Sequence, residues 1–296
     1  MGGSASQASS AASNARVSYG GQAIIEGVMM RGPRRIGIAV RKPDGGIVVT
    51  SQERVQYSRR HPLLGLPIIR GAASLVDSLV VGVDALMYSA NLSLDEGEKI
   101  GKGEMTATVS FSILLAVGLF IVAPTLAISF LKSRLGLSGV ALNLFEGILR
   151  LIILTGYLWS ISRFSDIQRV LAYHGAEHKV INAMENHLEL NVNSVRDMSP
   201  IHPRCGTSFL LVVAMTSVLL FSFFGWPGIV QRIVTRLLMF PVVAGVAYEF
   251  IRLSNRSRSP LVRLLASPGM YLQRFTTRSP DDSMIEVALK ALEAAR

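Results

Sequence analysis

Four of the five histidines in this chain, and its only cysteine, lie between Tyr173 and Gly206. The first group is His174-Gly-Ala-Glu177-His178. If this stretch is helical, the three named side chains share a face, because residues three and four apart are neighbours on a helix surface. Two imidazoles can bind one metal ion, and a carboxylate between them can activate a water molecule. The five-letter pattern occurs by chance, so it predicts little alone.

A second group, His202-Pro-Arg-Cys205, stands immediately before a long apolar run. Imidazole and thiolate are both preferred zinc ligands, so the two groups together favour one divalent metal site, with zinc as the expected ion. The ligands would be His174, His178, His202 and Cys205. Four ligands would make a closed, structural site, whereas three would leave a position for water and make Glu177 a candidate catalytic base. The alternative is that these side chains only form hydrogen bonds and pack the loop.

Other reactive residues carry weaker signals. Cys205 as a nucleophile with a histidine base is less favoured, because His-Pro-Arg-Cys matches no known nucleophile turn. His61 and His187 have no partners in the sequence and are expected to be ordinary. No phosphate-binding Gly-x-x-x-x-Gly-Lys-Ser/Thr motif is present.

Charged residues near apolar segments are accessory candidates. Glu249 lies inside an apolar run, where an ionisable residue is a functional candidate by default, although it could simply reach the interface. Glu26 and Arg31, in a glycine-rich N-terminal segment, are further accessory candidates inside the membrane.

The composition indicates which elements position these residues. The 296 residues are 50% hydrophobic and 17% charged, with a formal net charge of +10. This composition excludes a disordered polymer and favours a membrane protein with a basic face. A single cysteine excludes an intrachain disulfide and favours a reduced, cytosol-facing setting.

Hydropathy predicts a mainly α-helical polytopic membrane protein with about four transmembrane helices. The expected spans are 107–131, 142–162, 207–230 and 233–253, each long enough to cross about 30 Å of hydrocarbon. Glu146 and Arg150 lie four apart in the second span, where they can neutralise each other or sit at the interface. The other expected segments are a disordered tail at 1–17, a small β-rich module at 18–60, an interfacial amphipathic helix with a linker at 61–104, a His/Cys loop at 163–206 and a tail with an amphipathic helix at 254–296.

Two of these segments have recognisable local patterns. Ile36, Ile38 and Val40 alternate with small or basic residues before Asp44-Gly45, which predicts a β-hairpin. Near the C-terminus, Ser279-Pro-Asp-Asp begins a helix with apolar residues on one face.

Basic residues predict the orientation. Most lysines and arginines lie in the termini and the 163–206 loop, and the other side carries only Lys132, Arg134, Arg232 and Arg236. The positive-inside rule therefore places both termini and the His/Cys loop in the cytoplasm, with the anionic head groups of the bilayer as expected partners.

Several long motifs resemble the bacterial YqhQ family. They are Gly21-Gln-Ala-Ile-Ile-Glu-Gly-Val-Met-Met-Arg-Gly, Tyr173-His-Gly-Ala-Glu-His-Lys, His202-Pro-Arg-Cys-Gly-Thr-Ser-Phe and Thr277-Arg-Ser-Pro-Asp-Asp. The resemblance runs from about Tyr19 to the C-terminus. It implies a multi-pass protein of the bacterial inner membrane with a domain of unknown function that is often labelled a metal-dependent enzyme. It also implies that the protein works alongside the ribosome.

Two functions follow as hypotheses. The first is a membrane-embedded metal-dependent hydrolase, of proteins or lipids, with Glu177 activating water. The second is a non-enzymatic factor for membrane-protein biogenesis that meets the ribosome or translocon and has a structural metal or none. Transport ranks last, because the spans lack the Gly/Pro-broken repeats of secondary transporters.

Overall fold

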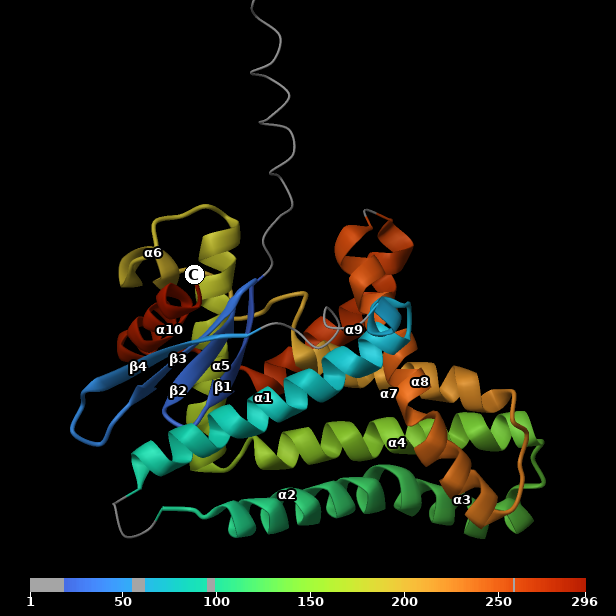
Figure 1. Cartoon of the computed structure of the whole chain (residues 1–296). Helices are drawn as coiled ribbons and strands as arrows, with labels where there is room; N and C mark the ends of the chain where they lie inside the picture. Colours follow the sequence, from blue (N-terminus) through green and yellow to red (C-terminus); the bar gives the residue numbers. More distant parts are fainter. Residues whose placement is uncertain (1–18, 55–61, 95–98, 258) are drawn as a thin grey trace, which may run out of the picture.

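The computed structural model describes residues 19–54, 62–94, 99–257 and 259–296. The expected disordered tail at 1–17 and His61 lie outside these residues, as do parts of the two expected N-terminal modules. In the described part, a small antiparallel sheet and its covering helices lie beside a set of long apolar helices (Figure 1). The predicted fold class is therefore confirmed.

The sheet contains four strands in sequential order, β1 (Gly20–Ile24), β2 (Gly27–Arg31), β3 (Arg35–Arg41) and β4 (Ile47–Glu53). The predicted hairpin is formed by β3 and β4, and Gly45 in its turn has a φ of 86°, which glycine adopts without strain. The glycine-rich segment before it forms the β1–β2 hairpin, which turns at Ile25 and Glu26.

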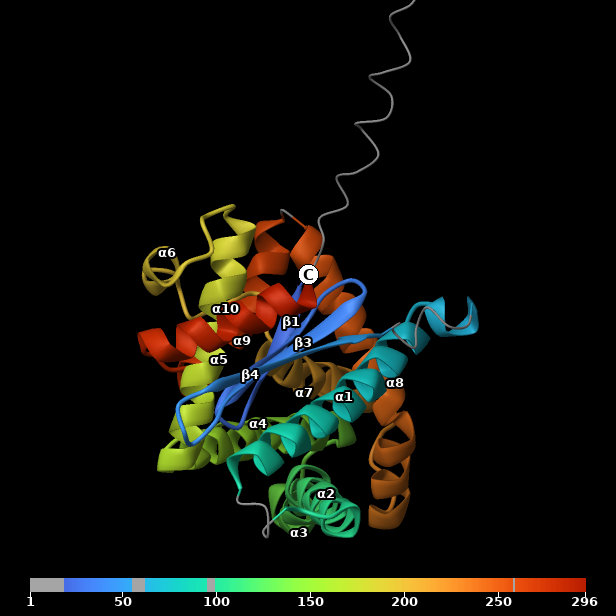
Figure 2. The same ribbon diagram turned by 60° about the vertical axis from the view of Figure 1, so that its left-hand side comes forward.

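Both faces of the sheet are covered (Figures 1 and 2). Ile36, Ile38 and Val40 pack with Val81 and Ala85 of α1 (Ile69–Ser93). On the opposite face, Val28, Met30 and Ala39 pack against α5 (Ser165–Glu185) and α10 (Asp282–Ala295). The alternation in β3 thus reflects burial on both sides, with smaller residues under α10.

Helix α10 is the expected amphipathic C-terminal helix. Asp281 caps it by accepting a 2.9 Å hydrogen bond from the backbone N–H of Met284. Its apolar face lies so close to β3 that a Cβ on Gly37 would come within 2.2 Å of the Ala291 carbonyl oxygen. Glycine at position 37 is therefore what allows the helix to dock on the strand.

The longest helical stretch is interrupted by a π-helical turn. It consists of α2 (Lys102–Val117), the turn η4 (Gly118–Val122) and α3 (Ala123–Leu135). Helix α4 (Gly139–Ile161) returns alongside it. The remaining elements are η2 (Pro62–Gly65), α6 (Val192–Arg196), α7 (Gly206–Ser222), α8 (Ile229–Arg256) and α9 (Pro260–Thr276).

Among the described residues, four helices are long and apolar enough to cross a membrane, so the chain is a membrane protein. They are Ile69–Ser93, Lys102–Lys132, Gly139–Ile161 and Ile229–Ser254. Helix α1 belongs to this set, although its sequence favoured an interfacial position, and α7 is shorter with 17 residues. Which of these helices span the bilayer stays a prediction.

Candidate metal centre

The two histidines of the first group lie on one face of α5, as their spacing predicts. The ring centroids of His174 and His178 are 4.3 Å apart. Between them, Gly175 allows the segment before α10 to approach: a Cβ there would lie 1.9 Å from the Arg278 carbonyl oxygen. The Arg278 backbone N–H donates a 2.9 Å hydrogen bond to Leu171 O, which fixes this segment against α5.

Each of these imidazoles has one nitrogen held by a backbone carbonyl. His174 Nδ1 lies 2.6 Å from Thr276 O at the end of α9, and His178 Nδ1 lies 2.7 Å from Pro200 O. A carbonyl only accepts hydrogen bonds, so both Nδ1 atoms carry the proton when the rings are neutral. The Nε2 lone pairs of both rings are then free to bind a cation, the arrangement found around metal-bound histidines.

Cys205 brings the third ligand from another part of the chain. It is the N-cap of α7, 6% exposed, and its Sγ lies 3.3 Å from His174 Nε2 and 3.4 Å from the Thr207 backbone nitrogen. The sulfur therefore accepts a hydrogen bond from the first turn of α7. The predicted convergence of the α5 and 202–205 segments is therefore seen in the structure.

The ligand atoms of His174, His178 and Cys205 all lie within 4.8 Å of one another. In tetrahedral zinc sites, bond lengths of about 2.0–2.3 Å place neighbouring nitrogen and sulfur ligands about 3.3–3.7 Å apart. The His174–Cys205 distance already matches that range. Two neutral imidazoles and one thiol are also a donor set that suits zinc. We define these three residues as the metal centre.

His202 lies beside the metal centre but does not belong to this ligand set. Its ring centroid is 5.8 Å from that of His178. However, Nδ1 accepts a hydrogen bond from the Arg204 backbone N–H at 3.3 Å, and Nε2 lies 3.4 Å from a Glu185 carboxylate oxygen. Burial lowers the pKa of His202, although Glu177 partly counteracts this, which favours a neutral ring that donates to Glu185. Its predicted role as a ligand stays a prediction.

Glu177 is buried close to the metal centre, with 4% of its surface exposed. Burial raises its pKa, and the nearby His174 and His202 rings and the Gly21 backbone N–H only partly oppose this effect. A Cβ on Gly21 would lie 2.9 Å from the Glu177 side chain, so glycine in β1 provides the room for the carboxyl group. The glycine-rich N-terminal segment thereby contributes to the site.

One buried residue next to the site was missed by sequence reasoning. Gln273 of α9 is fully buried; its amide accepts from the His202 backbone N–H at 3.0 Å and donates to His202 O at 2.8 Å. It also donates to Ser208 of α7 at 3.0 Å. Gln273 therefore holds the 202–205 segment against α7 and α9. An uncharged amide on an amphipathic helix carries no signal that predicts such a role.

The three accessory candidates form ion pairs with residues that do not belong to the metal centre. Glu249 of α8 accepts from Arg70 of α1, with 2.6 Å between Nε and Oε1. Glu26 accepts two hydrogen bonds from Arg169, at 2.6 and 2.5 Å, and Arg31 pairs with the buried Asp77. These pairs hold α1, α5 and α8 against their neighbours, and the accessory roles stay predictions.

The long apolar helices and the His/Cys centre define a polytopic membrane protein with a candidate metal site. Residues 66–296 match the family described as Protein of unknown function (DUF1385). The chain is also 31% identical over 288 residues to the Uncharacterized protein YqhQ of Bacillus subtilis (strain 168), an alignment covering 92% of this chain and 90% of the relative. The chain therefore belongs to the DUF1385 family and, as its motifs indicated, to the family of YqhQ. Neither description names an activity or a cofactor, and no solved structure matches.

Proposed function

We propose that this protein is a membrane-bound, metal-dependent hydrolase whose metal centre binds zinc through His174, His178 and Cys205. One observation carries the proposal: three ligand atoms from α5 and the start of α7 converge, while the other nitrogen of each imidazole is held by a backbone carbonyl. Three protein ligands leave a coordination position for water or substrate, as catalytic zinc sites do.

Glu177 is the base in this proposal. A zinc ion would supply Lewis acidity and make a water molecule more acidic. Glu177 would accept the proton of the attacking water and return it to the leaving group. Its burial and raised pKa suit proton transfer near neutral pH, because a carboxyl group with an ordinary pKa would be a weaker base.

Metal analysis of the detergent-purified full-length chain tests the site. We expect about one zinc per wild-type chain and strong loss in His174→Ala. The control is His187→Asn, because His187 is exposed near the end of the same helix, and asparagine tolerates its φ of 57°. In wild type loaded with cobalt, thiolate-to-cobalt absorption should appear and should be lost in Cys205→Ala. Equal metal content in His174→Ala and His187→Asn would refute the proposed ligands.

Glu177→Gln separates the base from the ligands. We expect this variant to retain its zinc and the cobalt absorption, because Glu177 is not a ligand in the proposal, and to lose hydrolysis of any substrate that a screen of membrane peptides and lipids identifies. Loss of metal from Glu177→Gln would instead make Glu177 a ligand.

A second candidate function is favoured by the burial of the site. His178, Cys205 and Glu177 are nearly inaccessible, and the centre joins α5, α7 and α9 through side chains and carbonyls. A structural metal in a non-enzymatic biogenesis factor at the ribosome or translocon fits these contacts. In that case chelation would unfold the protein, and Glu177→Gln would not change its function. The protein would also co-purify with ribosomes or translocon, and added salt would weaken this association.

We further propose that the metal centre faces the cytoplasm. The two short connections, at 136–138 and 223–228, lie together: Asn143 donates a 2.9 Å hydrogen bond to Gly225 O, and a Cβ on Gly139 would lie 3.3 Å from Trp226 Cβ. This proximity supports one shared side for both connections, as the positive-inside rule predicted. A membrane-impermeant maleimide should label Ser138→Cys in intact cells, and Asn186→Cys only after permeabilisation. The reverse pattern would overturn the orientation.

A further inference from the structure

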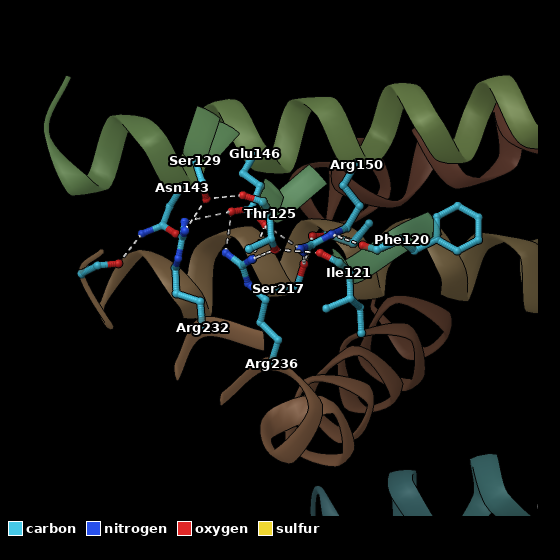
Figure 3. A network of polar contacts seen from close by, with 12 residues as sticks. Phe120, Ile121, Thr125, Ser129, Asn143, Glu146, Arg150, Ser217, Arg232 and Arg236 are labelled. Carbon is cyan, nitrogen blue, oxygen red and sulfur yellow. Dashed lines mark hydrogen bonds and ion pairs between the residues drawn. The ribbon is translucent and has the colours of Figure 1, made fainter. Parts of the chain in front are cut away.

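A second polar site is buried among the long helices, away from the metal centre (Figure 3). Its central residue is Glu146 of α4, which is 1% exposed. Arg150, one turn along α4, donates to Glu146 at 3.1 Å, which confirms the pairing that their spacing allowed. Arg236 of α8 donates to the other carboxylate oxygen at 2.7 Å. Arg232 of α8 lies 3.9 Å from the same carboxylate. We call these four residues the arginine cluster.

The arginine cluster has more positive than negative charge. Three guanidinium groups surround one carboxylate, and Glu146 is the only acidic residue between Glu104 and Asp166. The only acid on α8 is Glu249, which is paired with Arg70. Burying an uncompensated charge away from water is costly, so another negative group beside the cluster would stabilise it.

Two of the three arginines have their hydrogen bonds made within the protein. Arg150 Nε donates to Phe120 O at 2.8 Å, a carbonyl in the π-helical turn, and its Nη1 donates to Ser217 at 2.9 Å. Arg236 donates to Thr125 of α3 as well as to Glu146. These contacts fix the guanidinium groups of Arg150 and Arg236. Arg232 is the exception, because some of its donors are not used.

Arg232 has unused donors although it is 4% exposed. Its Nη2 donates to Ser129, but Nε and Nη1 are buried and have no hydrogen-bond partner among the residues that the structure describes. The guanidinium carbon lies 3.8 Å from the ring centroid of Trp226, so the aromatic ring covers one face of the group. Unsatisfied buried donors are rare in folded proteins and indicate a missing acceptor.

A cavity beside Arg232 provides the space for that acceptor. Arg232 and Arg236 line it together with Asn143, Thr235 and Gln231, and Phe221 and Phe224 form its apolar wall. It lies at the end of the bundle where α7 connects to α8, and the first turn of α8 adds positive potential there. The cavity is therefore both cationic and partly apolar.

We propose that the arginine cluster binds a phosphate group through Arg232, with Arg236 and the start of α8 adding to the attraction. Guanidinium donors match phosphate oxygens in geometry, and a phosphate group carries the one to two negative charges that the cluster lacks. The phosphate comes either from an anionic lipid head group, whose tail would follow the apolar wall, or from free phosphate. The inference is independent of the proposed hydrolase, because α7 separates the two sites by about 24 Å.

Thermal unfolding of the detergent-solubilised full chain tests the site and its two sources of phosphate. One arm compares sodium phosphate with sodium chloride at equal ionic strength. The other compares dioctanoyl phosphatidate with dioctanoylglycerol, which has the same tails without the phosphate. We expect at least one phosphate compound to raise the melting temperature of the wild type by about 5 °C at saturation. A shift with phosphatidate alone assigns the lipid, and an equal shift with inorganic phosphate assigns the free anion.

Arg232→Gln should abolish the shift. Arg163→Gln is the matched control, because Arg163 also stacks on a tryptophan, 4.7 Å from the Trp159 ring, but is exposed. Without added phosphate, Arg232→Gln should melt at or above the wild-type temperature, because it removes a buried uncompensated charge. If Arg232→Gln fails to fold, Arg232→Lys replaces it and should show a reduced shift. No shift in the wild type, or the same shift in the Arg232 variant, overturns the proposal.

Discussion

The metal centre and the arginine cluster are both buried polar sites, but they differ in which atoms the fold leaves unused. In the metal centre, backbone carbonyls hold the two Nδ1 atoms, so lone pairs on nitrogen and sulfur converge. In the arginine cluster, oxygen atoms accept hydrogen bonds from most of the N–H groups, but Nε and Nη1 of Arg232 have no acceptor among the described residues. The first arrangement offers lone pairs to a cation, and the second offers hydrogen-bond donors to an anion. The comparison teaches that the sign of a ligand's charge can be inferred from which atoms of a site are left without a hydrogen bond.

The largest expected effect tests whether the two sites are independent. Cys205→Ser should reduce zinc affinity more than about a hundredfold, because each ligand of a zinc site contributes about 3 kcal/mol of the 10–16 kcal/mol total. The phosphate-dependent melting shift should stay unchanged. Chelator competition measures the first quantity and thermal unfolding the second. A lost phosphate response in this variant would show that the sites depend on each other.

Comparable in free energy is the effect of Glu146→Gln, which removes the only negative charge of the arginine cluster. We expect a loss of about 3–5 kcal/mol in unfolding free energy, since the three guanidinium groups, two of them buried, would have no carboxylate among them. Chemical denaturation measures the loss, and added phosphate should recover part of it. Zinc content should equal that of wild type. A variant as stable as wild type without phosphate would mean that water already compensates the charges.

Gly175→Ala tests how the metal centre is assembled. The added Cβ would meet the Arg278 carbonyl at 1.9 Å, so the segment before α10 must move. We expect about 1–3 kcal/mol of destabilisation, which is typical of overpacking. We also expect weaker zinc binding, because Thr276, whose carbonyl holds His174 Nδ1, lies two residues before Arg278 and would move with it. Gly156→Ala, with open space at its Cβ, is the control. Unfolding and zinc titration of both variants measure the difference.

The smallest effect is expected at an exposed ion pair, where water competes with both partners. Arg196 donates to Asp282 and lowers the pKa of that carboxyl group. A lowered pKa in the folded state stabilises the fold above the ordinary aspartate value of about 4, and this contribution disappears as pH falls through the folded-state value. The melting temperature of Arg196→Gln should therefore be slightly below that of wild type at pH 7. At strongly acidic pH the two melting temperatures should be equal. A difference that grew with acid would contradict the pairing.

Local spacing predicted the parts of both sites that lie within one helix. The i, i+4 spacing placed His174 with His178 and Glu146 with Arg150, and both pairs are found. The position of Cys205 near the histidines also followed, from a loop that returns to the same region. Local patterns also predicted the hairpin at Asp44-Gly45, from the alternation before the turn, and the C-terminal helix, from its first residues and its apolar face.

Tertiary packing decided the rest. The orientation of the His202 ring depends on Glu185 and the Arg204 backbone, and neither contact follows from sequence spacing. Arg232 and Arg236 reach Glu146 from a helix about ninety residues away, so only packing brings them together. The sequence of α1 likewise did not indicate that Gly71 would pack directly against Gly245 of α8.

The π-helical turn at Gly118–Val122 has a consequence for comparing relatives of this protein. A π turn contains one more residue than an α turn, so everything after it is rotated by about 100° around the helix axis. Thr125 and Ser129 face the arginines because of that extra residue. A relative with a single-residue deletion here would direct both hydroxyl groups elsewhere while keeping every arginine. In an alignment, a one-position gap here would therefore mark an altered arginine cluster even where all three arginines are present.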